Sequence, residues 1–388
     1  MYITYNPLFK LTNVFPQQKN AYFKGEVWTR KTNSRIVLFS RGQWALKAIT
    51  ASVMKKRGKE KAKIYIPEYF CEISLTPIRM AGYNLCFYRI KPNFEPDITH
   101  LQKLKERYGT PDVLLFVHYF GFPQNILDTQ NWCKQNGVLL VEDAAHSLIP
   151  IPGIGDNGNP TFYTPWKFVN IPAGALLILP ELFDYIETEP SEKDGHVPFP
   201  LKWVLKQGVN YISQRIRLPL HRLRRASVKG HDVSEPIVAL ESPLCSSFSI
   251  NILGKHEQTI KDVCSKRKRN YRLIDEVFLD PKLEQYRLFE DVPASFAPYV
   301  YPFRIPAKHS LNLMISLNKK GVPASPWSDL SPEVKNSEEY PLSNDLRREV
   351  ITLPIHQDLT LAQINWMKKQ VLNCLEKLKT EASIYISS

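Results

Sequence analysis

Short apolar runs alternate with amphipathic segments between residues 60 and 180, and this alternation restricts the fold more than any other feature. Many residues of the runs are branched or aromatic, and several runs are apolar on both faces, which is typical of a mainly parallel sheet covered by helices. The segments between the runs end at or near glycines, where helices commonly end. We therefore expect a doubly wound α/β domain over residues 1–200. The expected strands are KIYIP from Lys63, NLCFYRI from Asn84, DVLLFVHYFG from Asp112, VLLVEDAAH from Val138 and GALLILP from Gly174.

The C-terminal part has a different pattern. A helical stretch from Asn251 is followed by two strand-like pieces, YVYPFRIP and VITLPIH, and by a last helix with Thr360 as its expected N-cap. This pattern predicts a smaller α+β domain over residues 246–388. Residues 201–245 between the two domains are expected to be a basic linker or insertion. The apolar face expected for the last helix consists of Ile364, Met367, Val371, Cys374, Leu375 and Leu378.

The charge of the chain favours anionic partners. It has 51 Lys and Arg against 38 Asp and Glu, a net charge of +13 over 388 residues. Residues 202–229 carry much of this charge, and their apolar positions could line one side of a helix lying on a membrane surface, although Gly208 and Pro219 interrupt it. A membrane-surface binding protein, or a weak contact with an anionic membrane, therefore stays open as an alternative. No nucleic-acid motif is present, so nucleic acid is not an expected partner.

Other classes of protein are less compatible with the sequence. The six cysteines form no CxxC pair and have no metal-ligand spacing with the histidines, so no metal site is expected. No run approaches the ~18 apolar residues that cross a bilayer. The N-terminus lacks the pattern of a signal peptide, and the expected location is the cytoplasm.

Two segments of the first domain have features of an anion and ring-binding site. In SRGQWALKAI from Ser40, a polar residue and a glycine precede a helix, whose first N–H groups could hold a phosphate or could form an ordinary helix start. In VEDAAHS from Val141, two carboxylates end an apolar strand, where ligands of α/β sheets bind. Asp143 there could keep a pyridine nitrogen protonated or could cap a turn. His146 could contact a ring hydroxyl or fill the bend.

A third segment, TFYTPWKFVNIPAGALLIL from Thr161, places Lys167 in an aromatic loop before a buried strand. Desolvation among aromatic rings lowers the pKa of a lysine, and the neutral amine is a nucleophile that forms Schiff bases. The alternative is a surface lysine whose stem packs on apolar neighbours while its charge stays in water.

In order and spacing, these segments resemble the DegT/DnrJ/EryC1/StrS family of pyridoxal 5′-phosphate (PLP)-dependent aminotransferases, the sugar aminotransferases of the aspartate aminotransferase (type I) fold. The resemblance implies PLP as cofactor, a homodimer with the active site at the subunit interface, and amino transfer from an amino acid, expected to be glutamate. The implied acceptor is a nucleotide-linked keto sugar for surface polysaccharides or secondary metabolites. A PLP enzyme acting on a non-sugar amino acid or metabolite is the alternative. The motifs that carry the resemblance are SRGQWAL, PEYF, VHYFG, VEDAAHS, FYTPWKFVNIPAGALL, KRKRNY near Arg269 and LPIHQDLT.

The resemblance also implies roles for individual residues. Lys167 would hold the cofactor covalently and carry the proton transfer, and its presence favours transamination, because family members with histidine there perform dehydration. Asp143 would pair with the ring nitrogen, and His146, where many members have glutamine, would sit at the ring oxygen. The implied phosphate contacts are Gly42, Gln43 and Thr164.

Some positions depart from the family pattern. Many members have a serine or threonine where Gln43 stands, a Phe or Trp that stacks on the cofactor where Cys71 stands, and two glycines where Ala173 and Gly174 stand. The ring-stacking residue is therefore unassigned, and its candidates are Tyr69, Phe70 and His118.

Two residues of the C-terminal part, Arg304 and His356, lie at the ends of expected strands. Each could face a cleft between the domains or be structural.

Overall fold

The computed structural model describes residues 3–8, 23–29, 34–181, 183–184, 199–215, 242–290, 292–296, 298–327 and 329–384. The greater part of the expected basic segment, from residue 216 to residue 241, lies outside the described residues.

A seven-stranded sheet forms the N-terminal part of the protein, in the order β1-β7-β6-β5-β4-β2-β3. The strands from β6 to β3 are parallel, whereas β7 is antiparallel to both of its neighbours. Every residue of β4 is buried, as expected for a strand covered on both faces. The strands are β1 (Arg35–Phe39), β2 (Lys63–Pro67), β3 (Asn84–Tyr88), β4 (Val113–Val117), β5 (Leu139–Asp143), β6 (Thr161–Tyr163) and β7 (Ala175–Leu179).

Helices pack on this sheet and several end where glycines predicted an end. The helix α2 packs against β1, β6 and β7, and α4 packs against β3 and α5. Gly58 and Gly137 follow α2 and α5 with φ of +62° and +64°, a left-handed conformation that glycine adopts without strain. The α/β class expected from the alternation is confirmed. These helices are α1 (Glu26–Thr29), α2 (Gly42–Arg57), α3 (Thr76–Met80), α4 (Ile98–Tyr108) and α5 (Leu127–Asn136).

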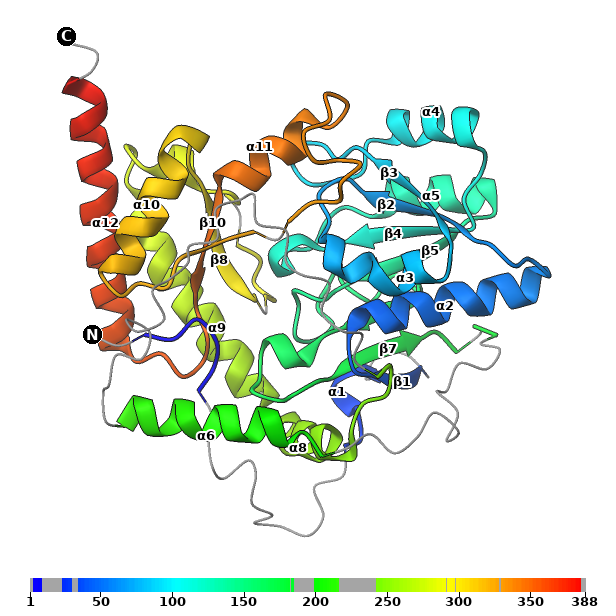
Figure 1. Cartoon of the computed structure of the whole chain (residues 1–388), viewed down its shortest axis with the longest axis horizontal. Helices are drawn as coiled ribbons and strands as arrows, with labels where there is room; N and C mark the ends of the chain where they lie inside the picture. Colours follow the sequence, from blue (N-terminus) through cyan, green and yellow to red (C-terminus); the bar gives the residue numbers. More distant parts are fainter. Residues whose placement is uncertain are drawn as a thin grey trace.

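A second, three-stranded antiparallel sheet has the order β8-β10-β9 and lies with α10 and α12 on the opposite side of the molecule from β2 and β3 (Figure 1). Its strands are β8 (Val300–Arg304), β9 (Ser325–Pro326) and β10 (Val350–Pro354). The remaining helices are α6 (Leu201–Arg215), α8 (Ser247–Glu257), α9 (Ile260–Asp275), α10 (Ala307–Lys319), α11 (Pro341–Glu349) and α12 (Leu361–Ile384). Short 3-10 helices cover Glu72–Leu75, Tyr119–Gly121, Pro165–Lys167, Glu276–Leu279 and Glu284–Tyr286.

The last helix begins where the sequence predicts. The hydroxyl of Thr360 accepts a hydrogen bond from the backbone N–H of Gln363 at 3.2 Å, and Oε1 of Gln363 accepts from the N–H of Thr360 at 2.8 Å. This reciprocal pair is a capping box. The expected apolar face is buried at Ile364, Met367, Val371, Cys374 and Leu375.

One large apolar core runs through both sheets. The rings of Phe122 and Phe289 join the two parts, with centroids 3.9 Å apart and planes 9° apart. Both parts share this core, so the core does not mark where one domain ends and the next begins. The domain boundaries expected near residues 200 and 245 stay predictions. The parallel strands β4, β5 and β6 end at the same edge of the sheet, so the residues that follow them are brought together there.

Candidate active site

Lys167 is the last residue of the 3-10 helix between β6 and β7. Its Nζ lies 3.2 Å from Nε2 of His146 and 5.7 Å from the centroid of the Tyr299 ring. Burial lowers the pKa of the Lys167 amine; the Asp143 carboxylate opposes this effect and the Arg41 guanidinium adds to it. The amine is therefore easier to deprotonate than that of a surface lysine, as a Schiff-base lysine requires.

Asp143 ends β5 on the neighbouring strand and is 6% exposed. Burial raises its pKa to about 6, although Lys167 and the N–H of Ala145 act in the opposite direction. Oδ1 accepts a hydrogen bond from that N–H at 2.8 Å, so the carboxyl does cap the turn after the strand. The capping role and a role towards a ligand are compatible, because the carboxyl group has a second oxygen.

The ring of His146 is held in one orientation by its neighbours. Phe120 and Tyr299 lie nearly parallel to it, with centroids at 6.1 and 5.7 Å and interplanar angles of 20° and 9°. The backbone N–H of Phe120 donates to Nδ1 at 3.4 Å, which assigns the ring hydrogen to Nε2, the atom beside Lys167. Burial and the neighbouring amine lower the pKa of His146. A neutral imidazole therefore presents an N–H at its edge, and its faces are covered.

Glu142, the other carboxylate of the VEDAAHS segment, has a structural position. It accepts hydrogen bonds from Nε2 of His118 and Nδ2 of Asn159, both at 2.9 Å, and from the N–H of Gly155 at 3.1 Å. Burial acts to raise its pKa, but these bonds hold the pKa below its usual value. The N–H of Gln124 occupies the other ring nitrogen of His118. This histidine is enclosed, and its environment does not favour it as the ring-stacking residue.

The other two candidates for ring stacking, Tyr69 and Phe70, are also buried. Tyr69 packs against Trp327 with centroids 6.0 Å apart, and Trp327 in turn meets the edge of His146 at 4.8 Å. The hydroxyl of Tyr69 and Nε1 of Trp327 are buried and have no hydrogen-bond partner among the described residues. Trp327 contacts His146 directly, and Tyr69 is connected to it through Trp327. A polar group of a ligand could satisfy such donors.

The start of α2 lies beside the lysine loop. The residue before it, Arg41, has an extended backbone and makes no side-chain cap, and its guanidinium lies 4.2 Å above the ring of Trp166. Among the described residues, no acceptor is paired with the N–H of Gly42 or Gln43. Uncapped N–H groups, the helix dipole and the positive charge of Arg41 are features that can bind an anion.

Thr164, the third expected phosphate contact, is next to Gly42. A Cβ on Gly42 would lie 3.0 Å from the Phe162 ring and 3.2 Å from Cγ2 of Thr164, so only glycine fits there without a shift. The hydroxyl of Thr164 donates to the carbonyl of Ala145 at 2.8 Å. Its oxygen can still accept a hydrogen bond, but its proton is already used.

Arg267 is a residue of this region that sequence reasoning missed. It lies on α9, is 1% exposed, and donates to the carbonyls of Phe168 at 3.0 Å and Tyr299 at 2.9 Å and to Oε1 of Gln357 at 3.0 Å. Burial lowers its pKa to about 10. Phe168 follows Lys167, so Arg267 connects the lysine loop to the ring that covers His146. The sequence signal that could have identified Arg267 is a single arginine on the apolar face of a predicted helix.

The hydrogen bonds of the two C-terminal candidates go to residues other than Lys167. Nε2 of His356 hydrogen-bonds the carbonyl of Thr4 at 2.9 Å, and Nε of Arg304 donates to Oε2 of Glu349 at 2.6 Å. These contacts favour the structural alternative for both residues.

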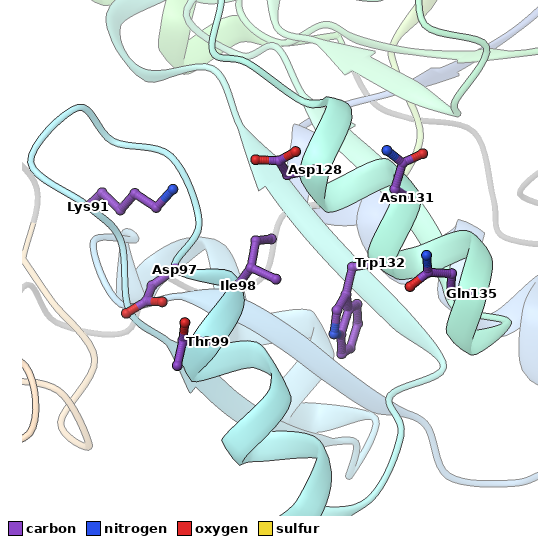
Figure 2. Close-up of a pocket in the computed structure, with 8 residues that line it drawn as sticks. All are labelled: Lys91, Asp97, Ile98, Thr99, Asp128, Asn131, Trp132 and Gln135. Atoms are coloured by element: carbon purple, nitrogen blue, oxygen red, sulfur yellow. The ribbon is translucent and has the colours of Figure 1, made fainter.

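A surface pocket of about 340 Å³ lies between the start of α4 and α5 (Figure 2). Asp97 there caps α4 by accepting from the N–H of His100 at 3.2 Å, and Trp132 stacks on Tyr65 at 6.4 Å. The pocket shares no residue with the surroundings of Lys167, so we do not assign it to the candidate active site. Its lining residues are Lys91, Asp97, Ile98, Thr99, Asp128, Asn131, Trp132 and Gln135.

Comparisons with known proteins support the fold. No protein-family model matches the chain, and no curated protein matches its sequence. Among solved structures, the PMP form of a sugar aminotransferase, Spr1654 from Streptococcus pneumoniae, has a TM-score of 0.68 at 15% identity, covering 99% of this chain and 100% of that chain. Helicobacter pylori PseC, an aminotransferase involved in the biosynthesis of pseudoaminic acid, has a TM-score of 0.61 at 15% identity and coverages of 97% and 100%. TlmJ, an aminotransferase from Streptoalloteichus hindustanus, has a TM-score of 0.60 at 16% identity and coverages of 89% and 86%.

At these identities the likeness establishes the fold. The chain has the aspartate aminotransferase (type I) fold that the sequence resemblance implied, including the mixed sheet and the smaller C-terminal sheet.

Proposed function

We propose that the chain is a PLP-dependent aminotransferase of the DegT/DnrJ/EryC1/StrS type. The observation that carries the proposal is the amine of Lys167, which has a lowered pKa and lies 3.2 Å from His146 in a fold shared with aminotransferases. The order of the anion site, Asp143 and Lys167 along the chain also agrees with the family pattern.

The residues present suit the three functional groups of PLP. Lys167 would bind its aldehyde carbon, Asp143 its ring nitrogen, and the uncapped start of α2 at Gly42 and Gln43 its phosphate. With a pKa of about 6, Asp143 is mostly ionised at pH 7, and a protonated ring nitrogen would stabilise the ionised form further. The bound group supplies an electron sink for a carbanion of the substrate.

The residues of the chain have separate tasks in this reaction. Lys167 would hold or release a proton at Nζ, and burial, which lowers the pKa of its amine, favours the release. The Nε2–H of His146 points to Nζ and can orient it or contact the ring oxygen. Phe120 and Tyr299 fix the histidine and exclude water from its faces. Thr164 donates its hydroxyl proton to the carbonyl of Ala145, so only its oxygen is left, as an acceptor. A phosphate needs donors, and we therefore assign Thr164 to holding the turn at Ala145 rather than to a phosphate contact.

The substrate proposal is finer and has less support. We infer a keto acceptor that is a nucleotide-linked sugar, with glutamate as donor, because solved structures of this fold include sugar aminotransferases and the net charge of +13 would attract a diphosphate. A homodimer with the active site at the subunit interface and a cytoplasmic location belong to the same proposal.

The test of the central assignment is borohydride reduction of the protein loaded with PLP, followed by peptide mass spectrometry. We expect one reduced cofactor on the peptide that contains Lys167, and none in Lys167→Ala. Lys134→Ala, which removes an exposed lysine of α5, is the matched control and should be labelled like the wild type. A label of equal yield in Lys167→Ala would overturn the assignment.

A second experiment separates transamination from other PLP chemistry. Incubation with glutamate should convert bound PLP to pyridoxamine phosphate and release one equivalent of 2-oxoglutarate, because the amino group stays on the cofactor. If no common amino acid converts the cofactor, the alternative of a PLP enzyme acting differently on an amino acid or metabolite is favoured.

A further inference from the structure

An apolar stripe lies exposed on α6. Leu201, Leu205 and Val209 are 58%, 62% and 57% exposed. We call these three residues the α6 stripe. Phe199 just before the helix is 54% exposed, but its ring packs against Phe248 on α8 at 4.9 Å, so it belongs to the docked side. Apart from Phe199, the other large exposed hydrophobic residues among those described are far apart along the chain. Single exposed residues are ordinary, but a row of them marks an interaction surface.

The opposite face of α6 is already in contact with the protein. The edge of Trp203 meets the ring of Phe248 on α8 at 6.2 Å, and Oε1 of Gln207 accepts from Nδ2 of Asn170 in the lysine loop at 3.3 Å. Leu201, Leu205 and Val209 are four residues apart, so at about 100° per residue they share one face of the helix. Figure 1 shows α6 at an edge of the molecule beside α8. The helix is thus docked through one face and leaves an apolar face outward.

Basic residues adjoin the α6 stripe. Lys202 and Lys206 are exposed and each follows a leucine of the stripe along the helix. From Leu201 to Gly230 the sequence has eight Lys and Arg and no Asp or Glu. An apolar row bordered by cations on a helix is the pattern of a segment that lies in the interface of an anionic bilayer.

We propose that the α6 stripe docks the protein on the surface of a bilayer that contains anionic lipid. The leucines would enter the boundary of the acyl chains, and the lysines would face the phosphates of the headgroups. The 15 residues of α6 extend about 22 Å, less than the ~30 Å of a hydrocarbon core, so the helix would lie on the membrane. No helix among the described residues is long and apolar enough to cross a membrane.

The charge favours a bilayer over a second copy of the chain. In a two-fold contact of the α6 stripe with itself, the lysines at 202 and 206 of both copies would come close together, with no acid between residues 201 and 230 to compensate. Nucleic acid would satisfy the lysines but would leave Leu201, Leu205 and Val209 in water.

The test is sedimentation of the full-length protein with vesicles of phosphatidylcholine, with and without about one third phosphatidylglycerol. We expect binding to the anionic vesicles, and a loss of affinity of about tenfold or more in Leu205→Glu, because a leucine that would enter the bilayer is replaced by an anion. Leu127→Glu is the matched control, since Leu127 is 61% exposed at the start of α5, and it should bind like the wild type. The pair Lys202→Gln and Lys206→Gln should weaken anionic binding without changing the circular dichroism spectrum.

Three outcomes would overturn the proposal. They are an absence of wild-type binding to anionic vesicles, equal binding by Leu205→Glu and Leu127→Glu, and a change in molar mass by light scattering in Leu205→Glu alone. The last result would show that a second copy covers the α6 stripe. None of these readouts depends on PLP, so they are independent of the proposed aminotransferase activity.

Discussion

The carboxyl of Asp143, which we propose contacts the ring nitrogen of PLP, also affects folding stability. Its native pKa of about 6 is higher than the ordinary value of 3.8, so between pH 4 and pH 6 the native chain holds more protons than the unfolded chain. Stability in the absence of cofactor therefore falls as pH rises through this range. The ionised carboxylate costs about 3 kcal/mol above pH 6.

We expect Asp143→Asn to stabilise the cofactor-free chain at pH 7 by about 3 kcal/mol relative to wild type and to have little effect at pH 4, because asparagine stays neutral. Urea unfolding at both pH values measures the difference. Asp128→Asn, on the exposed start of α5, is the control and should show no such change with pH. A stabilisation of the same size at pH 4 and pH 7 would mean that the charge of Asp143 is not the cause.

The sequence alone could predict those residues of the candidate site that are close to one another along the chain. Asp143 and His146 follow a strand, and Lys167 lies in the next loop, so their neighbourhood follows from parallel strands ending at one edge. Tyr299 and Trp327 come from the C-terminal part, over 100 residues away along the chain, and no local pattern shows where that part packs. The contact of Arg267 with the lysine loop has the same origin.

At the scale of elements, the turn after β4 controls the position of His146. Gly121 there has a φ of +87°, and a Cβ on it would lie 2.3 Å from the carbonyl oxygen of His146. A side chain at this position would strain the backbone and push the histidine segment away. The neighbouring residue Phe120, which stacks on His146, also has a positive φ of 57°.

We expect Gly121→Ala to destabilise the protein by roughly 2–4 kcal/mol and to weaken retention of PLP, because the clash acts on the segment that holds His146. Gly137→Ala is the matched control: its φ of +64° gives similar strain, but no atom lies within 4 Å of the added Cβ. Urea unfolding and dialysis of PLP-loaded protein measure the two effects. Equal losses in the two variants would attribute the effect to backbone strain alone.

The predictions of elements failed where the elements are short or broken. The strand β6 has three residues, and β1 has five, with an exposed first residue and only two buried ones, so neither has the fully apolar run that indicated the other strands. The single helical stretch expected from Asn251 is two helices, α8 and α9. Thr259 between them has φ −106° and ψ 2°, which does not continue a helix, and its hydroxyl donates to the carbonyl of His256.

At the scale of the whole molecule, Arg267 joins the C-terminal part to the lysine loop. A methionine in its place would remove the donors to the carbonyls of Tyr299 and Phe168, and Phe168 would keep only the hydrogen bond from Nε2 of Gln357 at 3.0 Å. Each lost partner costs about 1–3 kcal/mol, so we expect Arg267→Met to destabilise the protein by roughly 2–5 kcal/mol. We also expect it to weaken the binding of PLP, because Lys167 and Tyr299 lose their common support.

Arg267→Lys should restore part of the stability, since an ammonium reaches fewer acceptors than the planar guanidinium. Arg269→Met is the control, because Arg269 lies on the same helix and its side chain bonds only the amide oxygen of Asn270 among the contacts described. Urea unfolding followed by tryptophan fluorescence gives the stabilities, and dialysis of loaded protein gives retention of PLP. If Arg267→Met keeps the cofactor as firmly as Arg269→Met does, Arg267 supports the fold without positioning the site.

The pairing of β1 with β7 has a consequence for how the chain is made. β1 begins at Arg35 and β7 at Ala175, so about 140 residues must be synthesised before β1 meets its ladder partner. At about 5–20 residues per second, this wait lasts roughly 7–28 s. During that time the run RIVLF on a growing nascent chain has unpaired backbone groups, and chaperones that bind extended apolar segments can reach it. Asp143 and Lys167 leave the ribosome before β7 is complete, whereas Arg267 and Tyr299 follow later. The surroundings of Lys167 are therefore completed only when the C-terminal part has been synthesised.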